Sequence, residues 1–294
     1  MNTVHPTAIV GKRVELGDAN EIGPGCVIEE GVVLGSRNKL WHNVYVGPGT
    51  TLGDENQIHM GAVVGHIPQD VAFAGAPSYT KIGHRNTIRE YVTIHRGTKE
   101  GSSTIIGDDN YLMANAHIAH NCQVGHHVIL VNLASLTGYC VVEDGALLSG
   151  MVGLHQYTRV GRLALISALS AVNKDVPPYM LCGGRPGVIQ GLNVVGLRRA
   201  GISAAIREEI KRAYKLLYRF GLNVSHALDA IERECSSEEV RHLAAFVRSS
   251  ERGICAGLPA APGTPTEMET QGEGESILPR KTLRHSGAGE TPSS

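Results

Sequence analysis

Aliphatic residues recur at every sixth position along the first 172 residues of the chain. The row runs from Val4 to Val172, and 26 of its 29 positions hold Val, Ile or Leu. Only Asp70, Ala76 and Glu100 interrupt it. A period of six fits neither an α-helix, with about 3.6 residues per turn, nor an amphipathic strand, with a period of about two. It is typical of a hexapeptide repeat, in which short strands and turns alternate and stack into a parallel β-helix.

Turn-forming residues accompany this row. Glycine often follows the aliphatic residue directly, as at Gly11, Gly107 and Gly125. Glycine adopts tight corner conformations at little cost, and Asn and Asp do so less readily. Three hexads make one three-sided coil, so residue i lies about 4.8 Å from residue i+18. Since repeats of this kind are known to wind left-handed, we expect a mainly β fold, a left-handed parallel β-helix, over residues 1–180.

Two segments interrupt the repeat without shifting its register. Residues 66–81 replace almost a full coil, and residues 96–104 replace part of another. Insertions are tolerated at the corners of such a solenoid, but long ordered loops on a rigid scaffold more often carry function. We therefore expect both loops to contribute to a site.

The pattern changes after Val172. The segment 175–179 (DVPPY) contains two prolines, which cannot donate to a sheet, and should end the strands. A glycine-rich loop follows, and then helical periodicity over 204–221 after Ser203, over 226–235 after Ser225, and from Ser237 to about 247. We expect an α-helical C-terminal domain over 181–255 and a disordered tail over 256–294, where Gly, Pro, Ser, Thr and Glu show no periodicity.

Composition narrows the functional classes. The formal net charge is −1, which gives no support for binding to nucleic acid or to an anionic membrane surface. No stretch has the length and apolarity of an integral membrane segment, and the first ten residues show no leader pattern. The six cysteines have no paired spacing, so we expect a cytoplasmic protein with free thiols.

Histidines form the most reactive pattern in the repeat. His117 and His120 flank the inward Ile118, and His95 precedes the second loop. The spacing of 18 places His120, Gly138 and Gln156 in one column on one face of the coil. A histidine beside a glycine leaves room for a reacting group and exposes a backbone N–H, which is the layout of a general base with an oxyanion donor.

Two other interpretations of these histidines stay open. Any single one of them can lie on a solvated face of the β-helix without a function. His95, His117 and His120 could also supply three imidazoles to zinc, although no Cys or carboxylate completes that set.

At these residues the chain resembles the acyltransferases that use acyl carrier protein to acylate the 3-position of UDP-N-acetylglucosamine, the first step of lipid A biosynthesis. The resemblance covers about residues 1–255. The matching strings are VHPTAIV (4–10), QD (69–70), AGAP (74–77), IGHRNTIRE (82–90), VTIHRGT (92–98), NYLMANAHIAHNC (110–122), HQ (155–156), DVPPY (175–179), GLRR (196–199) and AYKLLYR (213–219).

The resemblance implies a homotrimer with active sites between subunits, acyl carrier protein as partner and acyl donor, a UDP-sugar acceptor, and neither cofactor nor metal. It implies that His120 is the general base and that Gly138 supplies the oxyanion N–H. The remaining roles follow in the same way. They are glucosamine contacts from Gln69, Asp70, His95 and His117, nucleotide contacts from His155, Gln156, Asn193 and Arg199, and control of acyl length by Ala168 and Leu169, where a small residue at 168 leaves room for a longer chain.

Five positions depart from the family pattern. Ala72 stands where a lysine is usual, Val195 where an acidic residue is usual, and Ala200 where a second arginine is usual. Asn121 replaces a carboxylate after the base, and Tyr139 replaces a histidine after the oxyanion glycine. These differences leave three alternatives open. The protein could acylate a different nucleotide sugar, such as a 3-amino analogue. It could instead be a zinc enzyme like the γ-class carbonic anhydrases, or a non-catalytic paralogue. Basic residues would bind the acidic carrier protein: Arg198, Arg199, Arg207, Lys211 and Arg212.

Overall fold

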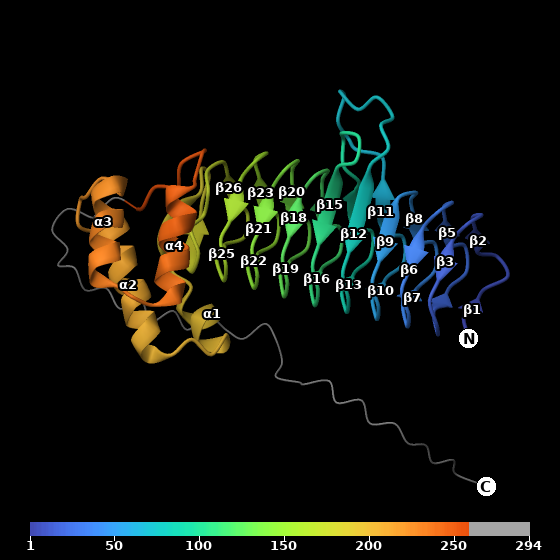
Figure 1. Ribbon diagram of the computed structural model, residues 1–294, viewed down its shortest axis with the longest axis horizontal. Helices are drawn as coiled ribbons and strands as arrows, with labels where there is room; N and C mark the ends of the chain where they lie inside the picture. Colours follow the sequence, from blue (N-terminus) through green and yellow to red (C-terminus); the bar gives the residue numbers. More distant parts are fainter. Residues whose placement is uncertain (259–294) are drawn as a thin grey trace, which may run out of the picture. The chain divides into compact units, whose positions relative to one another are not determined.

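The fold is a three-sided prism of stacked coils followed by helices (Figure 1). A computed structural model describes residues 1–258; the residues from 259 on, which hold most of the expected tail 256–294, lie outside the described part. Among the described helices, none is long and apolar enough to cross a membrane.

Three sheets form the three sides of the prism. The first sheet contains β1 (Thr3–Val4), β4 (Glu21–Ile22), β7 (Lys39–Leu40), β10 (Gln57–Ile58), β13 (Thr87–Ile88), β16 (Tyr111–Leu112), β19 (Ile129–Leu130), β22 (Leu147–Leu148), β25 (Leu165–Ile166), β27 (Met180–Gly183) and β28 (Val188–Leu192). The second contains β2 (Ile9–Val10), β5 (Val27–Ile28), β8 (Tyr45–Val46), β11 (Val63–His66), β14 (Thr93–His95), β17 (His117–Ile118), β20 (Ser135–Leu136), β23 (Gly153–Leu154) and β26 (Ala171–Val172). The third contains β3 (Glu15–Leu16), β6 (Val33–Leu34), β9 (Thr50–Leu52), β12 (Tyr79–Ile82), β15 (Ser103–Ile106), β18 (Gln123–Val124), β21 (Val141–Val142) and β24 (Arg159–Val160).

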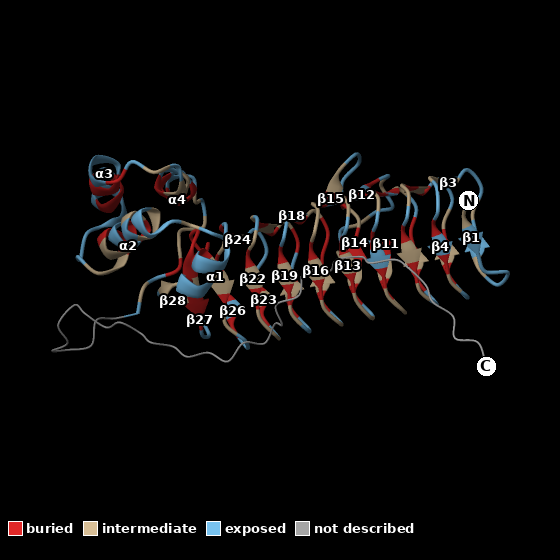
Figure 2. Ribbon diagram, turned by 90° about the horizontal axis from the view of Figure 1, so that it is seen from below, coloured by how far each residue is buried: buried red, intermediate tan, exposed pale blue. Residues whose placement is uncertain are grey.

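The strand register follows the predicted spacing of 18. Ile118 pairs in parallel with Leu136, and Leu136 pairs with Leu154. Every Val, Ile or Leu of the six-residue row from Ile22 onward is buried, and buried positions, in red, recur along the stacked coils in Figure 2. Val4 and Val10, also expected to point into the core, are 42% and 37% exposed. They lie in the first coil, which packs against another coil on one side only among the described residues.

A ladder of asparagines runs inside one corner of the prism. These side chains are buried, and each side-chain oxygen accepts the backbone N–H of the next rung at 2.7–3.0 Å. From the sequence, asparagine was expected only as a turn-forming residue. The ladder exists because a corner N–H has no strand partner and an unpaired buried N–H is costly. Its buried members are Asn20, Asn38, Asn56, Asn86 and Asn110.

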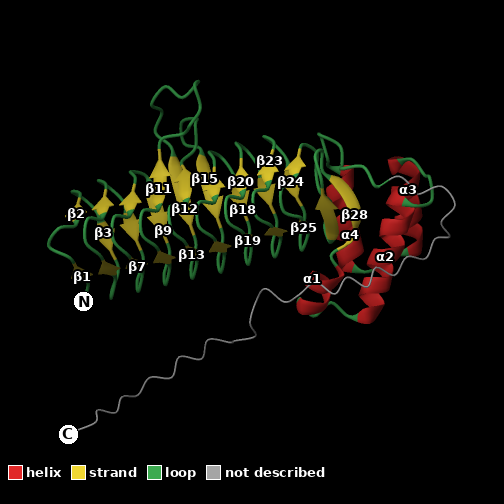
Figure 3. Cartoon of the chain, turned by 180° about the vertical axis from the view of Figure 1, so that it is seen from behind, coloured by secondary structure: helices red, strands yellow, loops and turns green. Residues whose placement is uncertain are grey.

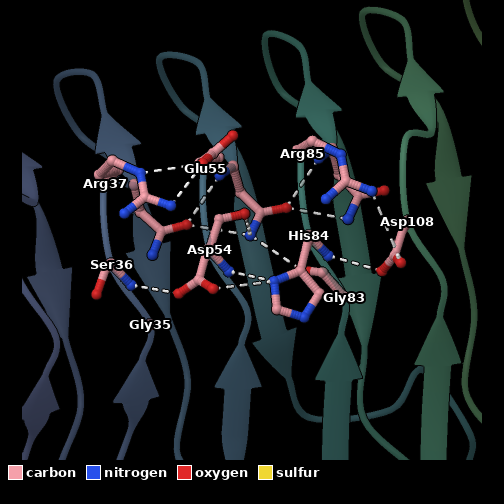
Figure 4. A network of polar contacts seen from close by, with 12 residues as sticks. Gly35, Ser36, Arg37, Asp54, Glu55, Gly83, His84, Arg85 and Asp108 are labelled. Atoms are coloured by element: carbon pink, nitrogen blue, oxygen red, sulfur yellow. Dashed lines mark hydrogen bonds and ion pairs between the residues drawn. The ribbon is translucent and has the colours of Figure 1, made fainter.

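A second column stacks on the outside of the same edge (Figure 4). The backbone N–H of Ser36 donates to the carboxylate of Asp54, that of Asp54 to the imidazole of His84, and that of His84 to Asp108. Ion pairs such as Arg85 with the carboxylate of Asp109, at 2.7 Å, lie beside this column. Exposed ion pairs of this kind contribute about 0.2–1 kcal/mol each, so the backbone hydrogen bonds matter more.

Strands continue past the segment 175–179, where we expected them to end. β27 extends the first sheet in parallel beside β25, and β28 then pairs with β27 in antiparallel fashion. The expectation was wrong because both prolines precede β27 and interrupt no strand pairing. The expected glycine-rich loop is the short turn between β27 and β28.

Within residues 1–258 four helices follow, at the end of the prism that carries the last coil (Figure 3). They are α1 (Val194–Arg199), α2 (Ala204–Tyr218), α3 (Val224–Glu234) and α4 (Glu238–Arg248). Ser203 caps α2 as predicted, but Asn223, not Ser225, caps α3 by accepting the N–H of His226. Helix α1 was not predicted, since six residues are too few to show helical periodicity.

A buried ion pair ties α4 to the last coil. Asp175 is 1% exposed and accepts the backbone N–H and the Nε–H of Arg159, at 2.9 and 3.0 Å, and the hydroxyl of Ser250. The guanidinium of Arg159 also donates to the carbonyl of Phe246 and stacks on its ring. Every polar atom of the carboxylate is thereby satisfied, which a buried charge requires.

We predict that Asn86→Ala destabilises the protein by about 3 kcal/mol, because it removes buried hydrogen bonds and leaves the N–H of Asn110 without a partner. Urea unfolding of the two proteins measures this difference. The control is Asn132→Ala, at an exposed turn, which should change the free energy of unfolding by less than about 0.5 kcal/mol. Equal effects of the two substitutions would contradict the structural role of the ladder.

Candidate functional site

Both inserted loops and His120 lie at the same edge of the prism. The first loop joins β11 to β12, the second joins β14 to β15, and His120 follows β17 on the way to β18. All three connections therefore run from the second sheet to the third. The loops project beside these strands in Figure 1. Because the coils stack, the loops overhang the coil that carries His120, and the expectation that both contribute to a site fits this placement.

The imidazole of His120 is nearly enclosed. The residue is 4% exposed, its Nδ1 lies 3.0 Å from Oδ1 of Asn121, and its Nε2 lies 3.8 Å from Oδ2 of Asp70 in the first loop. Oδ1 of Asn121 also accepts the backbone N–H of Thr98 at 3.1 Å, which identifies it as the amide oxygen. An oxygen acceptor at Nδ1 requires that Nδ1 carries the proton, so Nε2 has a free lone pair.

Gly138 lies directly against this ring, in the column that the spacing of 18 predicts. A Cβ atom at position 138 would overlap Cε1 and come within 2.6 Å of Nε2 of His120, so only glycine fits. The backbone N–H of Gly138 donates to no other group within residues 1–258. The carbonyl of Gly138 accepts the N–H of Tyr157, and the carbonyl of His120 accepts that of Tyr139, which continues the column toward Gln156.

Three further imidazoles lie in a row along the second sheet next to this edge, with their rings tilted or edge-on to one another. The rings of His66 and His95 are 6.3 Å apart, those of His95 and His117 are 5.0 Å apart, and Nδ1 of His117 lies 2.7 Å from the hydroxyl of Thr93. Burial, reinforced by the other histidines, lowers the pKa of His95 to about 4. Burial and His120 lower the pKa of His117 as well. Both rings are thus neutral at pH 7 and available for hydrogen bonding to an uncharged polar ligand.

The remaining predicted residues divide among the three edges. Gln69, His155 and Gln156 are exposed at the edge of His120. Ala168 and Leu169 are exposed at the edge between the first and second sheets.

Asn193 lies at the third edge, where α1 begins. It is 7% exposed, it caps α1, and its amide donates to the carbonyl of Leu163. Arg199, in the last turn of α1, is exposed. One chain therefore brings Asp70, His95, His117, His120 and Gly138 together, but not the residues of the other edges.

Sequence reasoning missed Thr98 as part of the site. It treated Asn121 and Tyr139 only as departures from a pattern. The structure places both beside His120, with the ring of Tyr139 edge-on to the imidazole at 5.3 Å. Among residues 1–258, no group of three His, Cys, Asp or Glu side chains is arranged to hold a metal ion.

Comparisons with known proteins give the family. The family models "Udp N-acetylglucosamine O-acyltransferase; Domain 2" and "Bacterial transferase hexapeptide (six repeats)" match residues 175–255 and 103–138. An acyl-[acyl-carrier-protein]–UDP-N-acetylglucosamine O-acyltransferase from Janthinobacterium sp. (strain Marseille) is 45% identical over 260 residues, 86% of this chain and 99% of that protein. The chain belongs to this acyltransferase family. A Synechocystis member is 42% identical over 193 residues, 66% of this chain and 70% of that protein.

Solved structures of the acyltransferase family have the same fold. The UDP-N-acetylglucosamine acyltransferase of Bacteroides fragilis matches with a TM-score of 0.83 and 40% identity over 86% of this chain and 99% of that one. That of Francisella novicida matches with a TM-score of 0.83 and 35% identity over 86% and 94%. The predicted left-handed parallel β-helix with C-terminal helices is thereby confirmed.

The low pKa of His95 predicts a loss of stability on acidification. The unfolded chain binds a proton at this side chain below about pH 6.5, whereas the folded protein resists protonation down to about pH 4. Between these values protonation favours the unfolded state, and stability falls by on the order of 2 kcal/mol from pH 7 to pH 5. We expect urea unfolding at both pH values to show a smaller fall for His95→Gln.

The control for this measurement is His226→Gln on the exposed face of α3, which should keep the full dependence on pH. An unchanged fall in the His95→Gln protein would show that His95 is not the group that resists protonation.

Proposed function

We propose that this protein transfers an acyl chain from acyl carrier protein to the 3-position of UDP-N-acetylglucosamine, the step that opens lipid A biosynthesis. One observation carries this proposal. The imidazole of His120, with its Nδ1 held by Asn121, lies directly against Gly138, whose backbone N–H donates to no group within residues 1–258, in a chain of this acyltransferase family. A base and an oxyanion donor in contact are what acyl transfer to a hydroxyl needs.

The residues support the following sequence of events. Nε2 of His120 takes the proton of the sugar 3-hydroxyl while the hydroxyl oxygen forms a bond to the carbonyl carbon of the thioester. The N–H of Gly138 stabilises the resulting oxyanion. The carbon–sulfur bond then breaks, and the imidazolium returns the proton to the leaving thiolate. The neutral rings of His95 and His117, together with Asp70, bind the hydroxyls of the glucosamine.

A homotrimer would complete the site. Ala168, Leu169, Asn193 and Arg199 lie on edges other than that of His120, so a neighbouring copy has to supply them if they line one substrate site. The edge between the first and second sheets carries exposed Leu133, Met151 and Leu169, at 45%, 55% and 52%. An exposed apolar column of this kind suits contact with another subunit or with an acyl chain.

The binding site for the acyl carrier protein, the acyl donor, would lie near α1 and α2. Arg198, Arg199 and Arg207 form no ion pair among the described residues, whereas Lys211 and Arg212 pair with Glu208 and Glu234. The three unpaired arginines are therefore better suited to an acidic carrier protein, and binding should weaken with salt. An acyl-carrier donor also fits the cytoplasmic location that we expect from six cysteines without disulfides.

The acceptor needs a direct test because Ala72, Val195 and Ala200 remove polar groups expected around the nucleotide sugar. The purified protein is incubated with acyl-carrier thioesters of several lengths, with and without a 3-hydroxyl group. UDP-N-acetylglucosamine and its 3-amino analogue serve as acceptors, and mass spectrometry identifies the products. We expect a 3-O-acyl product from UDP-N-acetylglucosamine. If only the 3-amino analogue is acylated, the proposed acceptor is wrong. If activity depends on stoichiometric zinc, the proposed mechanism is wrong.

We predict that His120→Ala lowers kcat/KM by about 10²–10⁴-fold, because it removes the general base. Light scattering should show an unchanged oligomer, since no strand pairing involves this side chain. His226→Ala, on the exposed face of α3, is the control and should keep full activity. Wild-type turnover by the His120→Ala protein would rule out His120 as the base.

A further inference from the structure

The second loop reaches the catalytic edge through Thr98. The backbone N–H of Thr98 donates to Oδ1 of Asn121 at 3.1 Å, and its hydroxyl donates to the same oxygen at 3.0 Å. The hydroxyl of Tyr139 lies 3.1 Å from the hydroxyl of Thr98. The same Oδ1 lies 3.0 Å from Nδ1 of His120. Thr98 thus binds the residue that holds His120 but forms no hydrogen bond with His120 itself.

These contacts have a fixed direction. A threonine hydroxyl has one proton, and here Oδ1 of Asn121 accepts it, so the hydroxyl of Tyr139 must donate to Thr98. Two donors from Thr98 converge on one atom of the amide, which excludes the NH₂ group from that place. Because this oxygen can only accept a hydrogen bond, the Nδ1 of His120 must be the protonated ring nitrogen.

The backbone around Asn121 is fixed as well. Its φ is +59°, and its N–H donates to the hydroxyl of Thr104 at 2.8 Å. The ring of Tyr139 packs edge-on against His120 and stacks on Tyr157 at 4.8 Å. Only rotation of the amide about its last side-chain bond could present NH₂ instead of oxygen to the imidazole, and Thr98 opposes that rotation.

We propose that Thr98 is a positioning residue that orients the amide of Asn121 and thereby fixes the tautomer of His120. A carboxylate at position 121 would need no such partner, because its two oxygens are equivalent acceptors. An amide has two unlike ends, and the second loop supplies the contact that distinguishes them. This inference rests on the proposed function of His120 as the base.

The test uses a double-mutant cycle of Thr98→Val with Asn121→Asp in the full-length protein. Thr98→Val keeps the shape of the side chain and removes its hydroxyl, and we expect kcat to fall about 10- to 100-fold with little change in KM. Thr98→Ser restores the donor and should retain most of the activity. In the Asn121→Asp background, Thr98→Val should lower kcat by less than about 3-fold, because the carboxylate is symmetric.

Two further measurements separate orientation from folding. Asn121→Asp should move the acidic limb of the kcat/KM profile to higher pH, since a carboxylate stabilises the imidazolium form. The matched control is Thr51→Val, whose side chain is exposed on the outer face of the third sheet. It should change neither kcat nor the thermal unfolding temperature.

Equal losses from Thr98→Val in both backgrounds would overturn the proposal, because a merely structural role of the loop does not depend on residue 121. Full activity of Thr98→Val would overturn it too. A wild-type protein without acyl transfer would instead refute the proposed function, so the two failures are distinguishable.

Discussion

The structure depends on backbone hydrogen bonding between residues one coil apart. This pairing gives each edge of the prism a column of equivalent positions, and the column brings His120 against Gly138. The two inserted loops leave this pairing intact. Ile58 pairs with Ile88 and Ile94 with Ile118, so the coils that contain the loops are longer by multiples of six residues. The strands on either side keep their inward faces, and all extra length leaves the prism at a single edge.

The fold and the central column could be predicted because buried aliphatic side chains repeat with a strict period. Burial decides where Ile118 or Leu136 points, and the neighbouring positions follow from it. The period carries no information about the loops, so the contact of Thr98 with Asn121 was not foreseeable. Helix α1 is too short to show a pattern, and the first coil exposes Val4 and Val10 despite an unchanged sequence signal. The asparagine ladder could have been found, since Asn20, Asn38 and Asn56 also recur every 18 residues.

The candidate site combines two neutral histidines with a hydrogen-bonded group that orients His120. His95 and His117 are kept neutral by burial, so they add no positive charge beside His120 that would disfavour its protonation during turnover. Asp70 in the first loop approaches Nε2 of His120, and Asn121 holds Nδ1. The two ring nitrogens of His120 therefore face different groups, Nε2 the carboxylate of Asp70 and Nδ1 the amide oxygen of Asn121.

The left-handed backbone conformation of Asn121, with a φ of +59°, bears on which side chains this turn accepts. Among residues with a side chain, Asn and Asp occupy this conformation most readily, and both present an oxygen at the same distance from the chain. A family member can thus exchange amide for carboxylate at this turn without rebuilding it. Such an exchange would alter the charge beside Nδ1 of His120, while the coil that carries it stays the same.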